Sequence, residues 1–485
     1  MLRSVRPPAR FPYSGKWAGP NRTVGARPGG EGTPRQSFHP ETFHKSHLIP
    51  YTQGGFPFVG GRVKDEVGVS SIEAVGTSYD VVVVGGGIAG AALSAQLAAA
   101  EQGVLILEAQ ETYRDKIRGE TIQPWGVREV VALGLEETLL GAGGEYTDAL
   151  VPYDENNEPA EAEARALPYS RVAPDVKGTL NVGHPEACEA LAAHAASAGA
   201  HVRRGITDVK ILAGPHPSVT WADASGSHEV SCRMVVGADG RTSGVRRQLG
   251  MKLKERPAFT FGAGLLVKGD TDFRGRNAFG TEGDELFLAF PRAGGYTRLY
   301  LLVGIARQRE FTGPGRLETF LSHFANRSFP ASTALAAAEV AGPCGGSPMT
   351  DSWTTTSPVV EGAVLIGDAA GWNDPIIGQG LSIALRDARS VAEVLLDSED
   401  WSPAAFSVYV EERTERMRRL AVSARIHTAM RCHFDHEWKQ RRRRWAEAIL
   451  TDPVVMAQAA CCLAGPEAFE AEAFSDRAVD ATLAM

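Results

Sequence analysis

The sequence is poor in the features that mark membrane proteins, disulfide-rich proteins and metalloproteins. No apolar run in its 485 residues approaches the length that crosses a bilayer, so no membrane span is predicted. The cysteines are few and scattered without a C-x-x-C pair, and no histidine cluster has metal-ligand spacing. These absences argue against a disulfide framework and a metal site, and they favour a reduced, cytoplasmic interior. The cysteines are Cys188, Cys232, Cys344, Cys432, Cys461 and Cys462.

Acidic residues are scarce at the start of the chain and abundant afterwards. Residues 1–64 hold ten Lys or Arg and two acids, so with a net charge of −8 for the whole chain the remainder carries −16. Residues 1–78 are rich in Arg, Pro and Gly without apolar periodicity, which predicts a disordered extension. A start codon placed too far upstream is the preferred explanation, ahead of a transit peptide and of a nucleic-acid-binding arm. With 43% hydrophobic residues overall, the chain can form a sizeable core.

The first organised stretch is typical of a dinucleotide-binding unit. An apolar strand at residues 80–84 is followed by Gly85-Gly86-Gly87-Ile88-Ala89-Gly90 and by a helix-forming stretch at residues 91–100. Gly85 permits the tight turn, Gly87 lets backbone amides approach a pyrophosphate, and Gly90 lets the helix pack on the strand. A second strand ends at Glu108, where a carboxylate would accept hydrogen bonds from a ribose diol. Together these features predict adenine dinucleotide binding, without choosing between FAD and NAD.

Two later strands also end at a turn that carries an Asp. One runs into Asp239-Gly240, with Ser243 or Thr242 available to cap the helix that follows. The other runs into Gly367-Asp368, a loop rich in Pro and Gly, and a helix from about Gln379. An Asp near exposed amides at a helix N-terminus suits a ligand with hydroxyls and a delocalised negative charge, such as a reduced flavin.

The block between these two strand ends has a different composition. Residues 259–267, 285–290 and 297–303 are rich in β-forming residues, and residues 291–295 link the last two segments as a hairpin. This block contributes nothing to a nucleotide fold, so it is predicted to be an inserted, largely antiparallel substrate domain. Residues 148–179 are short polar pieces that predict a surface hairpin or loop excursion.

The three motifs in this order resemble those of the para-hydroxybenzoate hydroxylase-like FAD-dependent monooxygenases, the single-component aromatic hydroxylases. The resemblance covers residues 79–420. It implies an α/β fold with an FAD-binding Rossmann-like domain of the glutathione reductase type, an inserted, mainly antiparallel β-sheet and a helical C-terminal region. The expected division is 79–257 with 345–400 for FAD, 258–344 with 149–183 for substrate, and 401–485 for the C-terminal helices.

The resemblance also implies roles for individual residues at the flavin. Asp368 would bond the ribityl chain, while the amides of Gly380, Leu381 and Ser382 would face the O2/N1 edge of the isoalloxazine ring. Arg118 matches a family Arg at the flavin and domain interface. The expected cofactor-binding set is Gly85, Gly87, Ile88, Ala89, Gly90, Glu108, Arg118, His184, Asp239, Asp368, Gly380, Leu381 and Ser382.

The sequence departs from the family pattern on the substrate side. Gly371 and Trp372 follow Asp-Ala-Ala where relatives often show His, Ser382 stands where Asn is common, and His184 falls where relatives often have Gln or Arg. Trp372 and Pro375 are therefore the pocket candidates, and no catalytic residue is assigned. His427 and His433 are interpreted as ordinary polar residues, like His184.

The implied activity is hydroxylation of an aromatic or other electron-rich small molecule, with NAD(P)H and O2, through a flavin C4a-hydroperoxide. The protein would hold the substrate close and keep water out. The substrate, the choice between NADH and NADPH, and the oligomeric state stay open. The basic clusters in residues 411–419 and 440–444 are interpreted as solvated helix faces or an interface rather than a nucleic-acid site, because the ordered chain is acidic.

Three alternatives stay open. A saturase of the geranylgeranyl reductase type is the stronger one, because that family shares the Gly-Glu after Arg seen at Arg118-Gly119-Glu120. A halogenase is disfavoured, since no lysine lies between Lys116 and Lys177 and no tryptophans have W-x-W spacing. A flavin-binding protein without turnover is the third.

Overall fold

The computed structural model describes residues 76–485, except Arg118, Asp270, Asp272, Arg274, Ala331 and Thr355. The predicted disordered extension lies almost wholly outside the described residues, and so does Arg118.

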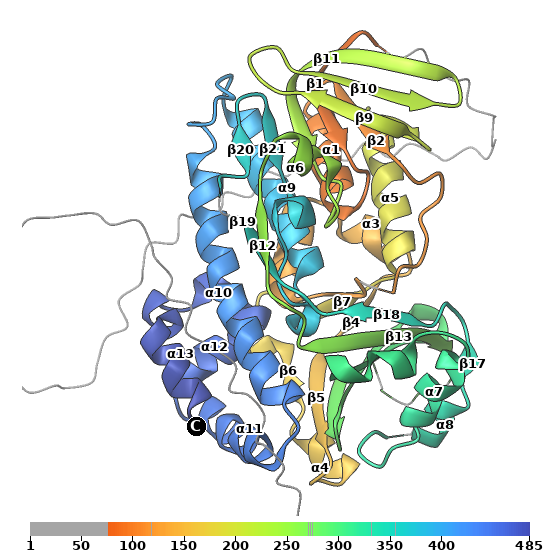
Figure 1. The fold of residues 1–485 in the computed structure, drawn as a ribbon, viewed down its shortest axis with the longest axis vertical. Helices are drawn as coiled ribbons and strands as arrows, with labels where there is room; N and C mark the ends of the chain where they lie inside the picture. The colour runs from red at the N-terminus through yellow and green to blue at the C-terminus, as the bar shows by residue number, and fades with distance from the viewer. Residues whose placement is uncertain are drawn as a thin grey trace, which may run out of the picture. The chain divides into compact units, whose positions relative to one another are not determined.

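The first sheet is built around the Gly-rich strand, and its order is β20-β21-β11-β1-β2-β8. Strand β1 pairs in parallel with both β11 and β2, and β11 pairs in parallel with β21. Buried parallel strands have apolar residues on both faces, which explains the continuous run Val81–Val84. Helices α1, α5 and α9 pack beside this sheet (Figure 1). The bounds are β1 Ser78–Val84, β2 Val104–Glu108, β8 His201–Arg204, β11 Gly226–Gly237, β20 Val359–Val360, β21 Ala363–Leu365, α1 Ile88–Ala99, α5 His184–Ser197 and α9 Gly380–Asp397, with β9 Thr207–Leu212 and β10 Ser218–Asp223 extending β11.

The second sheet is mainly antiparallel, as predicted, with the order β17-β13-β16-β15-β14-β5-β6 and β18 also pairing with β13. Strands β15 and β16 form the predicted hairpin around residues 293–295. Its core is aromatic, with Phe261, Phe287, Phe320 and Phe324 buried together. The bounds are β5 Ala149–Asp154, β6 Leu167–Pro168, β13 Thr260–Lys268, β14 Asn277–Glu282, β15 Glu285–Arg292, β16 Tyr296–Gly304, β17 Glu339–Val340, β18 Gly345–Pro348, α7 Arg316–His323 and α8 Ser332–Ala336.

Two details of the second sheet correct the sequence-based expectation. Residues 148–179 are not only a surface excursion, because β5 pairs with β14 inside the sheet. Its alternate residues Ala149, Val151 and Tyr153 are buried, a period-two pattern hidden by the polar residues around it. Strand β18 lies in this sheet as well, so the predicted boundary at 345 falls too early.

The remaining short elements join the two sheets. Strand β7 pairs with β3 and β4, and β12 pairs with β19. Their bounds, with those of the accompanying helices, are β3 Thr121–Ile122, β4 Glu145–Thr147, β7 Thr179–Asn181, β12 Leu253–Glu255, β19 Ser352–Thr354, α2 Pro124–Ala132, α3 Glu136–Gly141, α4 Pro159–Ala164 and α6 Gly244–Gln248.

The C-terminal region is helical, as predicted, and its longest helix, α10, runs beside both sheets (Figure 1). At one end the Tyr409 hydroxyl donates to the Leu365 carbonyl at 2.8 Å, and at the other end Cys432 packs with Leu286 and Leu302. The bounds are α10 Ser407–Cys432, α11 His436–Ile449, α12 Pro453–Ala464 and α13 Asp476–Leu483. Among the described helices none is by itself long and apolar enough to cross a membrane, and α11 with α12, bent by 91°, satisfies length and composition only as a pair.

Several arginines of the C-terminal basic clusters contact the rest of the protein, while Arg443 and Arg444 are exposed. Arg413 and Arg416 are 5% and 3% exposed, so the interface interpretation of residues 411–419 is correct there and the solvated one is wrong. In the second cluster, Arg442 donates to the Met430 carbonyl at 2.6 Å and Arg444 donates to the Met485 carbonyl at 2.7 Å. These arginines bind the ends of neighbouring helices.

Candidate functional site

The Gly-rich turn has the geometry that its sequence predicts. Gly85 has a φ of 107°, and a Cβ there would collide with the Ala238 carbonyl. A Cβ on Gly90 would collide with the Gly85 carbonyl, so this glycine sets the close approach of α1 to the strand. Nothing lies within 4 Å of a Cβ built on Gly87, which leaves the turn open to a ligand at the N-terminus of α1. Ile88 and Ala89 are buried as the first residues of that helix.

Glu108 ends β2 beside this turn. Its carboxylate accepts hydrogen bonds from the Gly86 amide at 2.7 Å and from the Gln110 amide at 2.9 Å. The Tyr113 hydroxyl donates to the Gly86 carbonyl at 2.5 Å, and burial raises its pKa. A carboxylate offers about four acceptor positions, so Glu108 is held against the turn and keeps capacity for a ribose diol.

The two Asp-bearing strand ends lie together. Asp239 accepts from the amides of Gly244 at 2.7 Å and Val245 at 3.1 Å. Ser243 caps α6, with its hydroxyl accepting from the Arg246 amide at 2.9 Å, so of the two predicted cap residues Ser243 is the one used. The other oxygen of Asp239 is buried and has no hydrogen-bond partner among the described residues.

Arginines after Asp239 reach across to the second strand end. Arg241 donates to the Asp368 carboxylate at 3.1 Å, and buried Arg246 donates to the Ala369 carbonyl at 2.8 Å. Asp368 lies in a short 3-10 turn, Gly367–Ala370, and its side chain is 25% exposed. The Asp239 and Asp368 motifs, far apart in sequence, therefore form one polar surface at the carboxyl end of the first sheet.

The N-terminus of α9 leaves backbone donors open. Its first helical bond joins the Ile383 amide to the Gln379 carbonyl at 2.9 Å, so the amides of Gly380, Leu381 and Ser382 precede it. No side chain caps this end, because Gln379 accepts instead from the Trp125 indole at 2.6 Å. Gly380 is exposed, with no atom within 4 Å of a Cβ built on it. An open, uncapped helix N-terminus fits the anionic edge of a flavin ring.

His184 begins α5 and lies at the same end of α9. A Cβ on Gly119 would lie 2.8 Å from the His184 ring and 3.4 Å from the Leu381 side chain. The segment next to Arg118 therefore contacts two other residues of the predicted cofactor set. The Ser382 hydroxyl is buried against Gly126, which agrees with the prediction that only the amide of this residue serves a ligand.

The two pocket candidates differ in how they can be reached. Trp372 is 5% exposed, and its indole donates to the Thr350 carbonyl at 3.1 Å. Pro375 is partly exposed at the start of the 3-10 turn η5, Pro375–Ile377. The Arg241 guanidinium lies 5.5 Å from the Trp372 ring centroid, so Trp372 packs within the loop, while Pro375 stays partly exposed.

Sequence reasoning missed two carboxylates in this stretch. Asp387 is 0% exposed and accepts from the Gly367 amide at 2.8 Å, from Arg413 at 2.9 Å and from Arg416 at 2.7 Å. Burial alone would raise the pKa of Asp387, but the two arginines outweigh it and hold the pKa below its usual value. Arg413 also donates to the Gly367 carbonyl at 3.1 Å, so α10 holds the loop that carries Asp368.

The second missed carboxylate, Asp374, directly precedes Pro375. It accepts from the Ile376 amide at 3.0 Å and from the Thr428 hydroxyl of α10 at 3.1 Å. Burial raises its pKa to about 6, with Asp351 adding to the rise and the two hydrogen bonds opposing it. The Asp-Pro pair in a loop was the available signal, but sequence spacing gives no measure of burial.

The histidines named in the sequence have structural contacts. Burial lowers the pKa of His427 to about 3, and its neutral ring bonds the Ala459 carbonyl at 3.1 Å. His433 is stacked between Phe259 and Trp438, with centroid distances of 4.1 and 4.5 Å.

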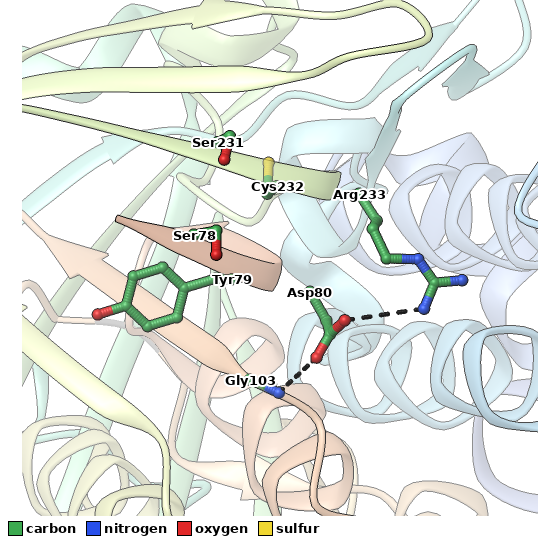
Figure 2. Close-up of a pocket in the computed structure, with 7 residues that line it drawn as sticks. All are labelled: Ser78, Tyr79, Asp80, Gly103, Ser231, Cys232 and Arg233. Carbon is green, nitrogen blue, oxygen red and sulfur yellow. Dashed lines mark hydrogen bonds and ion pairs between the residues drawn. The ribbon is translucent and has the colours of Figure 1, made fainter. Parts of the chain in front are cut away.

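A separate cavity of about 380 Å³ lies at the amino end of β1, beside the middle of β11 (Figure 2). Asp80 there accepts from the Gly103 amide at 2.8 Å and lies 3.7 Å from Arg233. The charged groups of this cavity, Asp80 and Arg233, are thus paired with each other. No predicted site residue lines the cavity.

Comparisons with known proteins agree with this geometry. The family model described as FAD binding domain matches residues 78–424. A 1H-pyrrole-2-carbonyl-(peptidyl-carrier protein) chlorinase of Pseudomonas fluorescens is 27% identical over 358 residues, covering 68% of this chain and 79% of its own. Digeranylgeranylglycerophospholipid reductase 2 of Methanothermobacter thermautotrophicus is 28% identical over 334 residues, covering 66% and 78%. The structure of p-nitrophenol 4-monooxygenase from Pseudomonas putida is similar with a TM-score of 0.67 at 17% identity, covering 80% of this chain and 98% of its own.

Proposed function

The chain belongs to the FAD binding domain family and is an FAD-dependent oxidoreductase; from that premise we propose that it is a monooxygenase. It uses NAD(P)H and O2 to hydroxylate an aromatic or other electron-rich small molecule. The observation that carries this proposal is the course of the loop after Asp368. This loop ends at the open N-terminus of α9. Its residue Ile376, a few positions before that helix, packs against an apolar cluster that includes Leu286 and Leu302. Such a wall excludes water from the place where oxygen is transferred.

The proposed cofactor contacts divide between the two ends of FAD. Gly85, Gly87, Gly90 and Glu108 bind the adenosine and pyrophosphate, with Ile88 and Ala89 heading α1. His184, Asp239 and Asp368 would lie along the middle of the cofactor, and the family resemblance implies that Arg118 would join them. The amides of Gly380, Leu381 and Ser382 would hold the ring end of the cofactor, where the helix N-terminus would stabilise a negative charge. When bound, FAD supplies electron transfer from NAD(P)H to O2.

The protein's own contribution is positioning. Arg413 and Asp387 fix the start of the loop, and the second sheet supplies the apolar wall against which a substrate is held. No side chain needs to act as nucleophile.

The test is a compound screen on protein expressed from Gly76, following NAD(P)H oxidation, O2 uptake and product mass. A hydroxylase shows stimulated oxidation coupled to O2 uptake and a product with one added oxygen. Oxidation without O2 uptake and a product with two added hydrogens contradict the proposal.

A saturase is the second candidate, and the similarity to the Methanothermobacter reductase favours it. Glu120, in the shared Gly-Glu pair, is buried and accepts from Arg298 of the second sheet at 3.0 Å. This contact joins the sheets and is compatible with either activity. The similarity to the chlorinase would suit a halogenase, but the sequence has no lysine between Lys116 and Lys177, which disfavours that activity. Halide incorporation in the same screen would reveal it.

A further inference from the structure

Asp374 is the titratable side chain on the part of the loop that turns toward the second sheet. It is partly exposed, and its two hydrogen bonds come from an amide and a hydroxyl rather than from a cation. The arginines nearest to this loop are engaged elsewhere, since Arg241 binds Asp368 and Arg256 binds Asp351 at 2.8 Å. A carboxylate in this setting keeps acceptor capacity for a ligand.

Thr428 places this site partly outside the shared family region. The family match ends at residue 424, whereas Thr428 and Cys432 lie beyond it on the same face of α10. The charged and titratable groups around Asp374 are Asp351 before β19, Arg241 before α6, and Cys432 on α10, which in turn is near Arg442 and Arg431. The pKa of Cys432 is raised by burial, so the thiol is neutral and Asp374 is the nearby proton acceptor.

The rest of the surroundings are apolar. Ile376, two residues after Asp374, packs with Leu286, Leu302 and Cys432, and Phe279, Met349 and Phe434 border the same cluster. A substrate hydroxyl that reaches Asp374 would meet one carboxylate among apolar side chains. Such a setting selects a neutral molecule that carries a hydrogen-bond donor.

We propose that Asp374, held by Thr428, is the catalytic base that binds a substrate hydroxyl, and that the substrate is a neutral, phenol-like compound. This inference rests on the proposed monooxygenase function. In the step assigned to Asp374, the substrate O–H bond breaks, the proton forms an O–H bond with the carboxylate, and the electron pair stays on the substrate oxygen. Nothing is oxidised or reduced, and the ring becomes richer in electrons before oxygen transfer.

The test compares 2-naphthol with 2-methoxynaphthalene, which has the same ring system without the donor. Binding to the FAD-loaded protein is followed by the change in the visible flavin spectrum. The wild-type protein is expected to prefer 2-naphthol by about tenfold, and the preference should appear as the pH rises through about 6. Asp374→Asn keeps an amide oxygen as acceptor but loses the charge, so its preference for 2-naphthol should be weaker and should no longer change with pH.

Two further variants separate this role from a general effect on folding. Asp452→Asn makes the same chemical change at the cap of α12, where Asp452 accepts from the Val454 amide at 2.8 Å, and it should keep the preference. Thr428→Val removes the donor that favours the ionised carboxylate, so it should keep the preference but move its onset to higher pH.

The inference and the proposed function fail in different ways. Equal binding of the two compounds by the wild type, no binding of either, or an unchanged preference in Asp374→Asn overturns the role of Asp374. If the preference behaves as expected while no compound supports O2 uptake, the binding role stands and the monooxygenase proposal falls.

Discussion

Asp374 and Asp387 are two carboxylates on one stretch of chain, the first partly exposed and the second buried, and their surroundings shift their pKa values in opposite directions. Asp387 meets Arg413 and Arg416 and keeps its charge, so its pKa lies below the usual value. Asp374 meets an amide and a hydroxyl, and its pKa rises to about 6 because burial is not offset by a cation. The difference teaches that burial alone assigns neither a structural nor a chemical role; the partners decide.

The two carboxylates also differ in what depends on them. Asp387 connects the turn before Asp368, helix α9 and helix α10, so its loss affects the support of the whole loop. Asp374 connects one short turn to Thr428, and the hydrogen bonds that favour its ionised form come from two neutral donors. Substitutions can separate these two situations.

The largest effect is expected for Asp387→Asn. The change leaves buried Arg413 without a counter-charge and leaves Arg416 with only the partly exposed Glu412, so the free energy of unfolding should fall by about 3–5 kcal/mol. Urea unfolding measures this, with Asp452→Asn as the matched control at a partly exposed helix cap. A loss below about 1 kcal/mol would show that the arginines find other partners.

A smaller, pH-dependent effect of opposite sign is expected for Asp374→Asn. A carboxyl group whose pKa is raised on folding contributes its full stabilisation below pH 3.8, the ordinary pKa of an aspartate. That contribution is lost as the pH rises through about 6. The variant should therefore gain about 1–2 kcal/mol relative to wild type between about pH 4 and pH 8. Thermal unfolding across this range measures the gain, and a pH-independent difference would contradict it.

Ser243→Ala tests a cap without charge in the other strand-end motif. The hydroxyl is buried and caps α6 through the Arg246 amide, so its loss should cost about 1 kcal/mol. Ser475→Ala, at the cap of α13, is the exposed counterpart and should cost less, since its bond to the Ala478 amide is 3.4 Å long. Equal losses of stability in the two variants would show that burial does not strengthen the Ser243 cap.

The smallest stability effect is expected for Thr428→Val. The variant loses one neutral hydroxyl, which donates a hydrogen bond to the partly exposed carboxylate of Asp374. The free energy of unfolding should therefore fall by about 0.5–1 kcal/mol. Thermal unfolding at low pH, where Asp374 is protonated, should show the smaller part of this change. A loss as large as that of Asp387→Asn would mean that Thr428 supports the fold rather than the carboxyl.

Local pattern predicted the parts of the site that depend on neighbouring residues. The turn at Gly85, the end of β2 at Glu108 and the cap at Ser243 all follow from a few adjacent positions. The open N-terminus of α9 was anticipated from its Gly-rich approach. The roles of these residues toward FAD stay predictions.

Long-range packing explains what could not be predicted. Strand β5 is recognised only by its pairing with β14, more than a hundred residues later, and Arg413 looks like a surface charge until α10 is placed against Asp387. The raised pKa of Asp374 likewise depends on Thr428 and Asp351, which no sequence spacing connects to it.

Helix α10 sets the distance between two parts of the loop that joins Gly367 to α9. Arg413 holds the start of the loop and Thr428 holds its middle, so one rigid helix fixes the separation between them. Inserting a single residue between Arg416 and Thr428 would turn the far end by about 100° and shift it by about 1.5 Å. The loop's first half would stay clamped while Asp374 lost its partner. Changes in helix length would thus retune the region beside Pro375 and leave the Gly367 end untouched.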